Sequence, residues 1–110
     1  MKLSEFAKKM NMTVITGIND HDPEIESIYI GDLLSRVMSK AGEKDAWVTI
    51  HTSLNTIAVA VMANIPCIIL PESITADPAS IQRASRENIA ILTSSMNAYE
   101  IAWRAHEILC

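Results

Sequence analysis

Glycine and cysteine are scarce in this sequence, and each shortage removes a class of function. The three glycines are Gly17, Gly31 and Gly42, so neither the G-x-x-x-x-G-K-S/T phosphate loop nor the G-x-G-x-x-G dinucleotide fingerprint can be built. The two cysteines, Cys67 and Cys110, form neither a C-x-x-C pair nor a disulfide framework. The G-x-S-x-G and H-E-x-x-H motifs are absent as well. Kinase, covalent and metal-assisted chemistry therefore have no motif in this sequence.

Positive charge is also limited. Nine Lys and Arg against thirteen Asp and Glu give a net charge of -4, and the basic residues are scattered, which argues against nucleic-acid binding. No window reaches about 18 consecutive apolar residues, and residues 1–12 mix lysines with an acidic residue, so we expect neither a membrane span nor a signal peptide. Together with the cysteine usage, this predicts a cytoplasmic protein.

Apolar residues, by contrast, make up 49% of the 110 residues, enough for one domain, 1–110, with its own core. The periodicity predicts strands at 13–16, 27–30, 46–50, 66–70 and 89–92, and helices at 3–10, 33–40, 54–63, 78–87 and 98–109. Strands with two apolar faces that alternate with helices predict an α/β fold. We expect a three-layer α/β/α sandwich with a mostly parallel sheet of four or five strands. The first strand is the expected antiparallel exception, because the polar segment 18–26, rather than a helix, joins it to the second.

The segment 46–63 is expected to form the centre of the domain. A short apolar strand is followed by the polar turn His51-Thr52-Ser53 and then by an alanine-rich helix almost without charge. This composition predicts a helix buried on nearly every side. Burial would force Asn55, in its first turn, to find a hydrogen-bond partner.

Polar side chains follow several of the predicted strands. Because ligands of open parallel sheets bind outside the carboxyl ends of the strands, the candidate ligand-binding residues are Gly31, Asp32, His51, Thr52, Ser53, Asn55, Ser94 and Ser95. The loop 71–73 belongs to the same edge. The start of the helix after Ser53 presents backbone N–H groups to a phosphate or carboxylate. The sequence therefore predicts a site for a nucleotide-like or other anionic ligand, and it indicates no metal and no particular cofactor.

Structural roles are the alternatives for these residues. Asp32, and either Thr52 or Ser53, are also suited to be helix N-caps, and His51 is also suited to a structural role. The acidic segment 20–26 around His21 fits a solvated loop better than a metal site, because it lacks the spacing of a calcium loop.

Three parts of the chain resemble the DRTGG domain family. They are the strand and glycine-aspartate turn at 28–34, the strand end at 47–51 and the asparagine before an A-V-A helix at 54–60. With the strand and helix that follow, the resemblance covers nearly the whole chain. The Gly-Gly pair of the family is missing, and Pro71-Glu72-Ser73 stands near its expected place. The resemblance implies a non-catalytic, often dimeric domain that accompanies CBS domains and phosphate acetyltransferases, with a fold similar to the amino-terminal domain of HPr serine kinases.

Two functions follow from these observations. The first is a regulatory or assembly module that forms a homodimer and binds an anionic ligand at the strand ends. The second is a small enzyme that uses His51 and Asp32 as an acid–base pair on a phosphorylated substrate. Trp103, beside the apolar stripe of the last helix, is expected to pack in the core, or to mark an interface if it is exposed.

Overall fold

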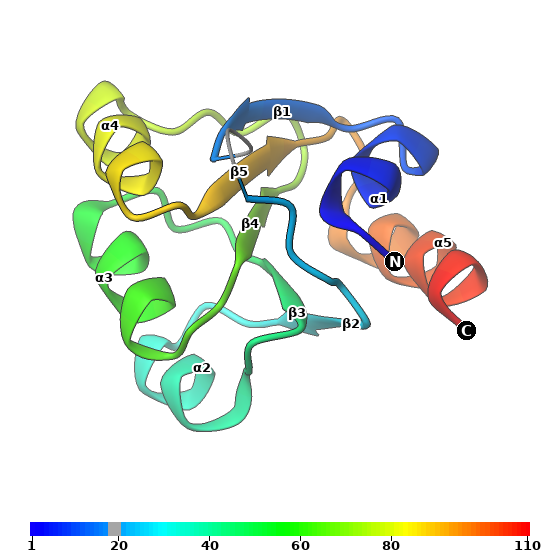
Figure 1. Cartoon of the computed structure of the whole chain (residues 1–110), viewed down its shortest axis with the longest axis horizontal. Helices are drawn as coiled ribbons and strands as arrows, with labels where there is room; N and C mark the ends of the chain where they lie inside the picture. The colour runs from blue at the N-terminus through cyan, green and yellow to red at the C-terminus, as the bar shows by residue number, and fades with distance from the viewer. Residues whose placement is uncertain (18–20) are drawn as a thin grey trace.

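The computed structural model describes residues 1–17 and 21–110, which form a five-stranded sheet between two layers of helices (Figure 1). Residues 18–20 of the predicted first loop lie outside the described residues. The strands are β1 (Thr13–Thr16), β2 (Ser27–Ile30), β3 (Asp45–Val48), β4 (Cys67–Leu70) and β5 (Ala90–Thr93). The helices are α1 (Leu3–Lys9), α2 (Leu34–Lys40), α3 (Leu54–Met62), α4 (Pro78–Arg86) and α5 (Ala98–Leu109). The strand order is β1-β5-β4-β3-β2.

Helices α2, α3 and α4 cover one face of the sheet, and α1 and α5 cover the other (Figure 1). Strands β2 to β5 are parallel, and each crossover moves to the next strand in the same direction, so right-handed connections place α2, α3 and α4 on one face. Successive strand residues alternate between two cores: Ala46 and Val48 pack with α1 and α5, and Trp47 packs with the other three helices. The predicted α/β/α sandwich with a mostly parallel sheet is confirmed.

Strand β1 is the antiparallel exception, as predicted, and its partner is β5. Strands β1 and β2 lie at opposite edges of the sheet, so the two strands joined by this loop do not pair with each other. Just after β1, Gly17 has a φ of 99°, and a Cβ placed there would lie 2.4 Å from the Cα of Ala90. Only glycine allows the chain to pass so close to the backbone of β5.

Three helices end at an asparagine in the left-handed conformation. Asn11, Asn64 and Asn88 have φ values of 56°, 58° and 57°. The residues that follow these asparagines are buried and apolar: Met12, Ile65 and Ile89. The N–H of each donates at 2.9 Å to the carbonyl five residues earlier, as in a Schellman motif. Gly42, shortly after α2, does not adopt this conformation although glycine favours it, and its N–H donates to the Asp45 carboxylate at 2.8 Å.

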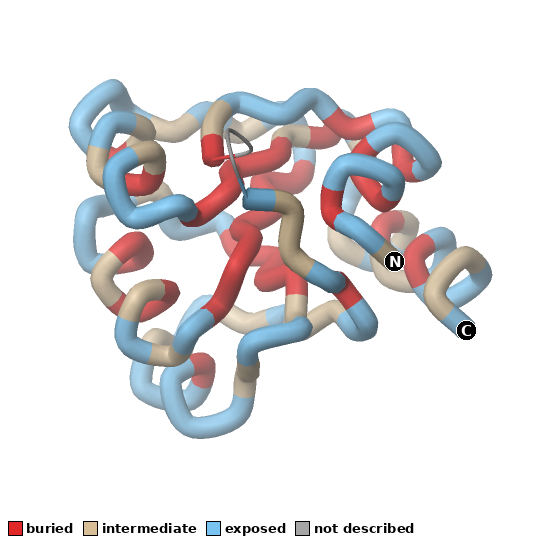
Figure 2. The backbone as a smooth tube through the Cα atoms, viewed as in Figure 1, coloured by how far each residue is buried: buried red, intermediate tan, exposed pale blue. Residues whose placement is uncertain are grey.

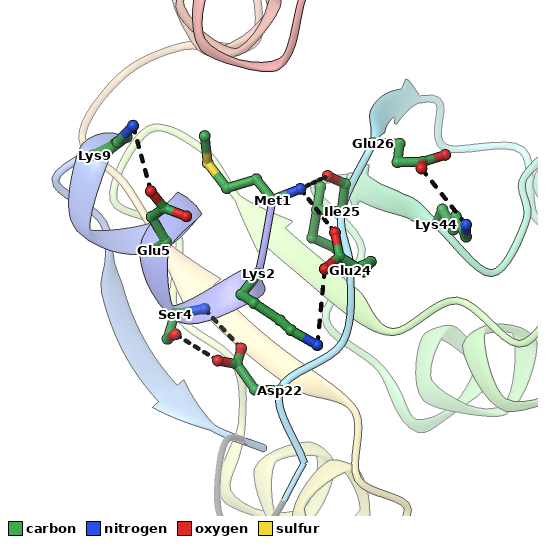
Figure 3. Close-up of polar contacts among 10 residues, drawn as sticks. All are labelled: Met1, Lys2, Ser4, Glu5, Lys9, Asp22, Glu24, Ile25, Glu26 and Lys44. Atoms are coloured by element: carbon green, nitrogen blue, oxygen red, sulfur yellow. Dashed lines mark hydrogen bonds and ion pairs between the residues drawn. The ribbon is translucent and has the colours of Figure 1, made fainter.

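A carboxylate from the segment before β2 caps α1 (Figure 3). Asp22 accepts hydrogen bonds from the N–H and the hydroxyl of Ser4, at 2.9 and 2.6 Å. The hydroxyl donor is the main reason that the pKa of Asp22 lies below its ordinary value. Ser4, in the first turn of α1, is therefore the residue whose N–H group is capped.

Helix α3 is less buried than its composition predicted (Figure 2). Its inner face is buried, but Asn55 and Met62 are exposed, because α2 and α4 flank α3 and leave its outer side to solvent. The expectation of burial on nearly every side is wrong. None of the helices within residues 1–17 and 21–110 has the length and apolar character that crossing a bilayer requires.

Candidate functional site

The segments that follow β2, β3, β4 and β5 lie along one edge of the sheet, because these strands are parallel. The predicted site residues occupy three places along this edge. They are the end of β2 with Gly31 and Asp32, the start of α3 with His51, Thr52, Ser53 and Asn55, and the end of β5 with Ser94 and Ser95.

The Asp32 carboxylate joins the ends of β2 and β3. Its Oδ1 accepts hydrogen bonds from the Thr49 hydroxyl at 2.8 Å and from the Ile50 N–H at 3.0 Å. In the described structure no side chain caps α2, so the N-cap role predicted for Asp32 is wrong. The Gly31 carbonyl accepts a hydrogen bond from the Trp47 indole at 2.8 Å. Both residues of the glycine-aspartate turn therefore hold neighbouring strand ends together.

The starts of α3 and α4 are tied to each other. The Ser80 hydroxyl donates to the Thr52 carbonyl at 2.7 Å, and the Ser80 N–H donates to the Asp77 carboxylate at 2.8 Å. This backbone donor is the main cause that lowers the pKa of Asp77, which caps α4 as its Asp-Pro sequence predicts. Ser53 occupies the N-cap position of α3, but its side chain makes no capping hydrogen bond. The N–H groups in the first turn of α3 are thus left without a side-chain cap.

A void of about 10 Å³ lies behind this junction, with His51, Thr52, Thr56 and Ser80 among its lining residues. Thr56 is 1% exposed, and its hydroxyl has no hydrogen-bond partner in the described chain. The void has about the volume that one water molecule needs. An unpaired buried hydroxyl lowers the stability of the fold.

An open hollow lies between the first turns of α3 and α4. Ser53 and Asn55 line one side, and Asp77 lines the other. Asn55 is exposed, so burial does not force it to find a partner, contrary to the expectation from the sequence. The hollow offers backbone N–H groups to an anion, but the Asp77 carboxylate stands beside them.

A cavity of about 450 Å³ lies between the loop before α4, β1 and the end of β5. Isoleucines and an alanine line part of it, and the rest is hydroxyls and one amide: Asn11, Thr13, Ser73, Thr75, Thr93, Ser94 and Ser95. None of the described residues that line it carries a charge. Ala76 lines both this cavity and the void beside Thr56, so the cavity adjoins the start of α3. The lining suits a polar, uncharged chemical group.

The loop after β4 is held in an unusual backbone conformation at this cavity. Glu72 and Ser73 have φ values of 57° and 59°, which favour glycine. Their N–H groups donate to the carbonyls of Met96 and Ser94 at 2.9 and 2.8 Å. The loop stands near the place expected for the Gly-Gly pair of DRTGG domains. Its backbone has a conformation that glycine favours, although Glu72 and Ser73 stand there.

Sequence reasoning missed the residues that the first strand brings to the cavity. Asn11 and Thr13 lie there because β1 pairs with β5, with Thr13 opposite Thr93. The sequence predicted an antiparallel β1 without identifying its partner. Thr75 was missed because the predicted site ended at residue 73.

Three further observations bear on catalytic and metal chemistry. Among the ion pairs of the described residues, none joins His51 to Asp32, and the Asp32 carboxylate already binds the end of β3. Burial raises the pKa of the Cys67 thiol, so this cysteine stays protonated. Residues 1–17 and 21–110 hold no group of three His, Cys, Asp or Glu side chains placed to bind a metal ion.

No family model matches the chain, and no curated protein matches it. Among solved structures, the chain is similar to the CBS and DRTGG domains of the regulatory region of Clostridium perfringens pyrophosphatase, complexed with the activator diadenosine tetraphosphate. The TM-score is 0.73 at 10% sequence identity, over 94% of this chain and 45% of that one. The chain therefore has a DRTGG-like fold, and it spans less than half the length of that regulatory region.

Proposed function

We propose that this chain is a non-catalytic regulatory module that binds a nucleotide-like ligand at the carboxyl edge of its sheet. The observation that carries the proposal is the hydroxyl-lined cavity of about 450 Å³ at that edge. Its volume is in the range of roughly 300–1,000 Å³ typical of small-molecule pockets. The regulatory region with the same fold is complexed with a dinucleotide activator, which supports a nucleotide-like ligand.

The charges along the edge indicate how such a ligand lies. The uncharged hydroxyls and amide of the cavity suit a sugar or a base. The start of α3, with Ser53 and Asn55 exposed, suits one anionic group, because the helix dipole is positive there. Asp77 beside this place repels further negative charge. We therefore favour a nucleoside or a nucleoside monophosphate over a polyphosphate.

Self-association as a homodimer is the second part of the proposal. Tyr99 and Trp103 on α5 are 80% and 45% exposed, and exposed aromatic residues are typical of interfaces. Membership of the DRTGG family and a cytoplasmic location complete the proposal. The enzyme hypothesis has no supporting contact, because Asp32 is engaged by Thr49 and Ile50.

Thermal unfolding of the purified chain with a panel of nucleosides, nucleotides and sugar phosphates tests the ligand. A ligand at about 100 times its dissociation constant adds roughly 2.7 kcal/mol to the free energy of unfolding. In a domain of this size, that raises the unfolding midpoint by about 10 °C. We expect a nucleoside or nucleoside monophosphate to give the largest shift.

A pair of tryptophan substitutions locates the site. Ser95→Trp places a large side chain in the cavity, and Ser35→Trp places the same side chain on the exposed surface of α2. We expect the ligand shift to disappear in S95W and to persist in S35W. A panel without any shift, or a shift that survives in S95W, would overturn the proposed site.

A further inference from the structure

Strand β2 is an open edge of the sheet, with β3 on one side only. The N–H groups of Ser27 and Gly31 donate to carbonyls of the β3 side, at 3.3 Å each. Because the direction of backbone groups alternates along a strand, the N–H and C=O groups of Ile28 and Ile30 point away from β3. The strand contains no charged residue and no proline, which are the usual protections of an exposed edge.

The opposite edge is less suited to pairing. Strand β1 contains a register shift between Val14 and Thr16, and such bulges bend an edge away from regular pairing. Strand β2, by contrast, pairs with β3 in unbroken register over all four of its residues. The edge with the regular backbone that pairing with another strand requires is therefore β2.

Helix α5 extends this edge on one face of the sheet. A groove of about 200 Å³ runs between α5 and β2, lined by Ile28 and Ile30 on the strand and by Ala102 and Leu109 on the helix. Tyr99, Trp103 and His106 follow one another at helical spacing on the adjoining, exposed flank of α5. An apolar strand edge and an aromatic helix flank thus face solvent side by side.

We propose that a second copy of this chain pairs with β2 in antiparallel fashion, so that the five-stranded sheet becomes a ten-stranded one. The inference rests on the self-association in the proposed function and names its surface. Ile28 lies opposite Ile30 of the second copy, and Tyr29 lies on the twofold axis. In this register both outward-pointing residues of each strand exchange N–H and C=O hydrogen bonds. Antiparallel pairing of a strand with its own copy is self-complementary, as a twofold dimer requires.

The charges around the edge fit this arrangement. Near a twofold axis every charge meets its own copy, and residues 27–31 carry none. At each end, Glu26 approaches Asp32 of the second copy, and Lys44, 3.5 Å from Glu26, supplies the opposite charge. The two acidic side chains that the paired strands bring together, Glu26 and Asp32, are therefore accompanied by a lysine.

Exposed aromatic side chains on α5 supply part of the area that a dimer buries. A stable dimer buries roughly 800 Å² on each partner, of the 5939 Å² that this chain exposes. Tyr99 and Trp103, at 80% and 45% exposure, supply roughly 250 Å² of it, since a large aromatic side chain has about 150–250 Å² to bury. The strand edge and the rest of the α5 flank lie next to these two residues.

Sedimentation velocity over a concentration series tests the surface. The chain has a mass of 12.1 kDa, and we expect a dimer of twice that mass. Ile30→Lys puts a charge on the β2 edge at a side chain that is 47% exposed, so the fold tolerates it, and the dissociation constant should rise about 100-fold or more. Val14→Lys puts the same charge on the β1 edge at a side chain that is 39% exposed, and it should leave the dimer unchanged.

Two further variants guard against a folding artefact. Trp103→Ala should raise the dissociation constant about tenfold, with an unfolding midpoint that shows an intact domain. Lys44→Glu should weaken the dimer more at low salt than at high salt. If the unaltered chain is a monomer, the proposed self-association fails. If it is a dimer that V14K dissociates and I30K does not, self-association stands and this surface is wrong.

Discussion

Replacing Thr56 by valine should make the protein more stable. Valine has nearly the shape of threonine, with a methyl group in place of the hydroxyl, and both residues are similar in helix propensity. Thr56 is 1% exposed and its hydroxyl is unpaired in the described chain. An unpaired buried hydroxyl costs about 1–3 kcal/mol, and the new methyl group adds apolar burial. We expect the free energy of unfolding to rise by about 1–2 kcal/mol.

The size of the effect on thermal unfolding follows from the length of the chain. The entropy of unfolding is about 2.1 cal/mol/K per residue, which gives about 0.23 kcal/mol per degree for 110 residues. The midpoint should therefore rise by about 4–9 °C. Calorimetry gives the midpoint, and urea titration gives the free energy independently.

The matched control is Thr49→Val. Thr49 is also buried, but its hydroxyl donates to Asp32 at 2.8 Å, so the same substitution should lower stability by about 1–3 kcal/mol. A loss of stability in T56V would refute the reasoning. It would mean that the Thr56 hydroxyl binds a partner in the adjoining void of about 10 Å³, with one water molecule as the partner that fits.

Two other substitutions test a side-chain hydrogen bond and a left-handed backbone conformation. Asp22→Asn should lower stability at neutral pH, with a difference from the unaltered protein that shrinks as the pH falls. The pKa of Asp22 in the folded state lies below its ordinary value because of the Ser4 hydroxyl. Its contribution is therefore present above the ordinary pKa and is lost as the pH falls through the folded-state pKa. Urea unfolding between pH 7 and pH 2 measures this, and a difference that stays constant with pH would contradict it. Ser73→Gly should raise stability by up to about 1 kcal/mol, because it relieves a left-handed residue at φ 59°. Ser35→Gly, in the first turn of α2, should lower it by up to about 0.5 kcal/mol, and a loss in both variants would rule out relief of strain at Ser73.

The architecture could be predicted because it depends on periodicity within short segments. Apolar strands that alternate with amphipathic helices define the layers, and Asp77-Pro78 marks the start of α4. Local signals can also be overlooked: asparagine-apolar pairs such as Asn64-Ile65 end helices here, whereas Gly42 after α2 does not take the left-handed conformation.

The site depends on which strands are neighbours, and a single sequence does not carry that information. Asp32 precedes a helix and has the residue type of an N-cap, but the pairing of β2 with β3 places the Thr49 hydroxyl 2.8 Å from it. Asn55 follows an apolar strand and precedes apolar residues, but it lies on the outer side of α3. Asn11 and Thr13 reach the cavity only because β1 crosses to the far edge of the sheet.

Short contacts join the loops along the carboxyl edge of the sheet from one side to the other. Asp32 ties β2 to β3 through Thr49, and Ser80 ties the start of α4 to that of α3 through the Thr52 carbonyl. The Ser73 N–H then ties the loop after β4 to the end of β5. These bonds fix the backbone that carries the cavity hydroxyls before any ligand arrives. Since ordering of loops is part of the cost of binding, a small ligand that makes few charged contacts can still bind with useful affinity at an edge built in this way.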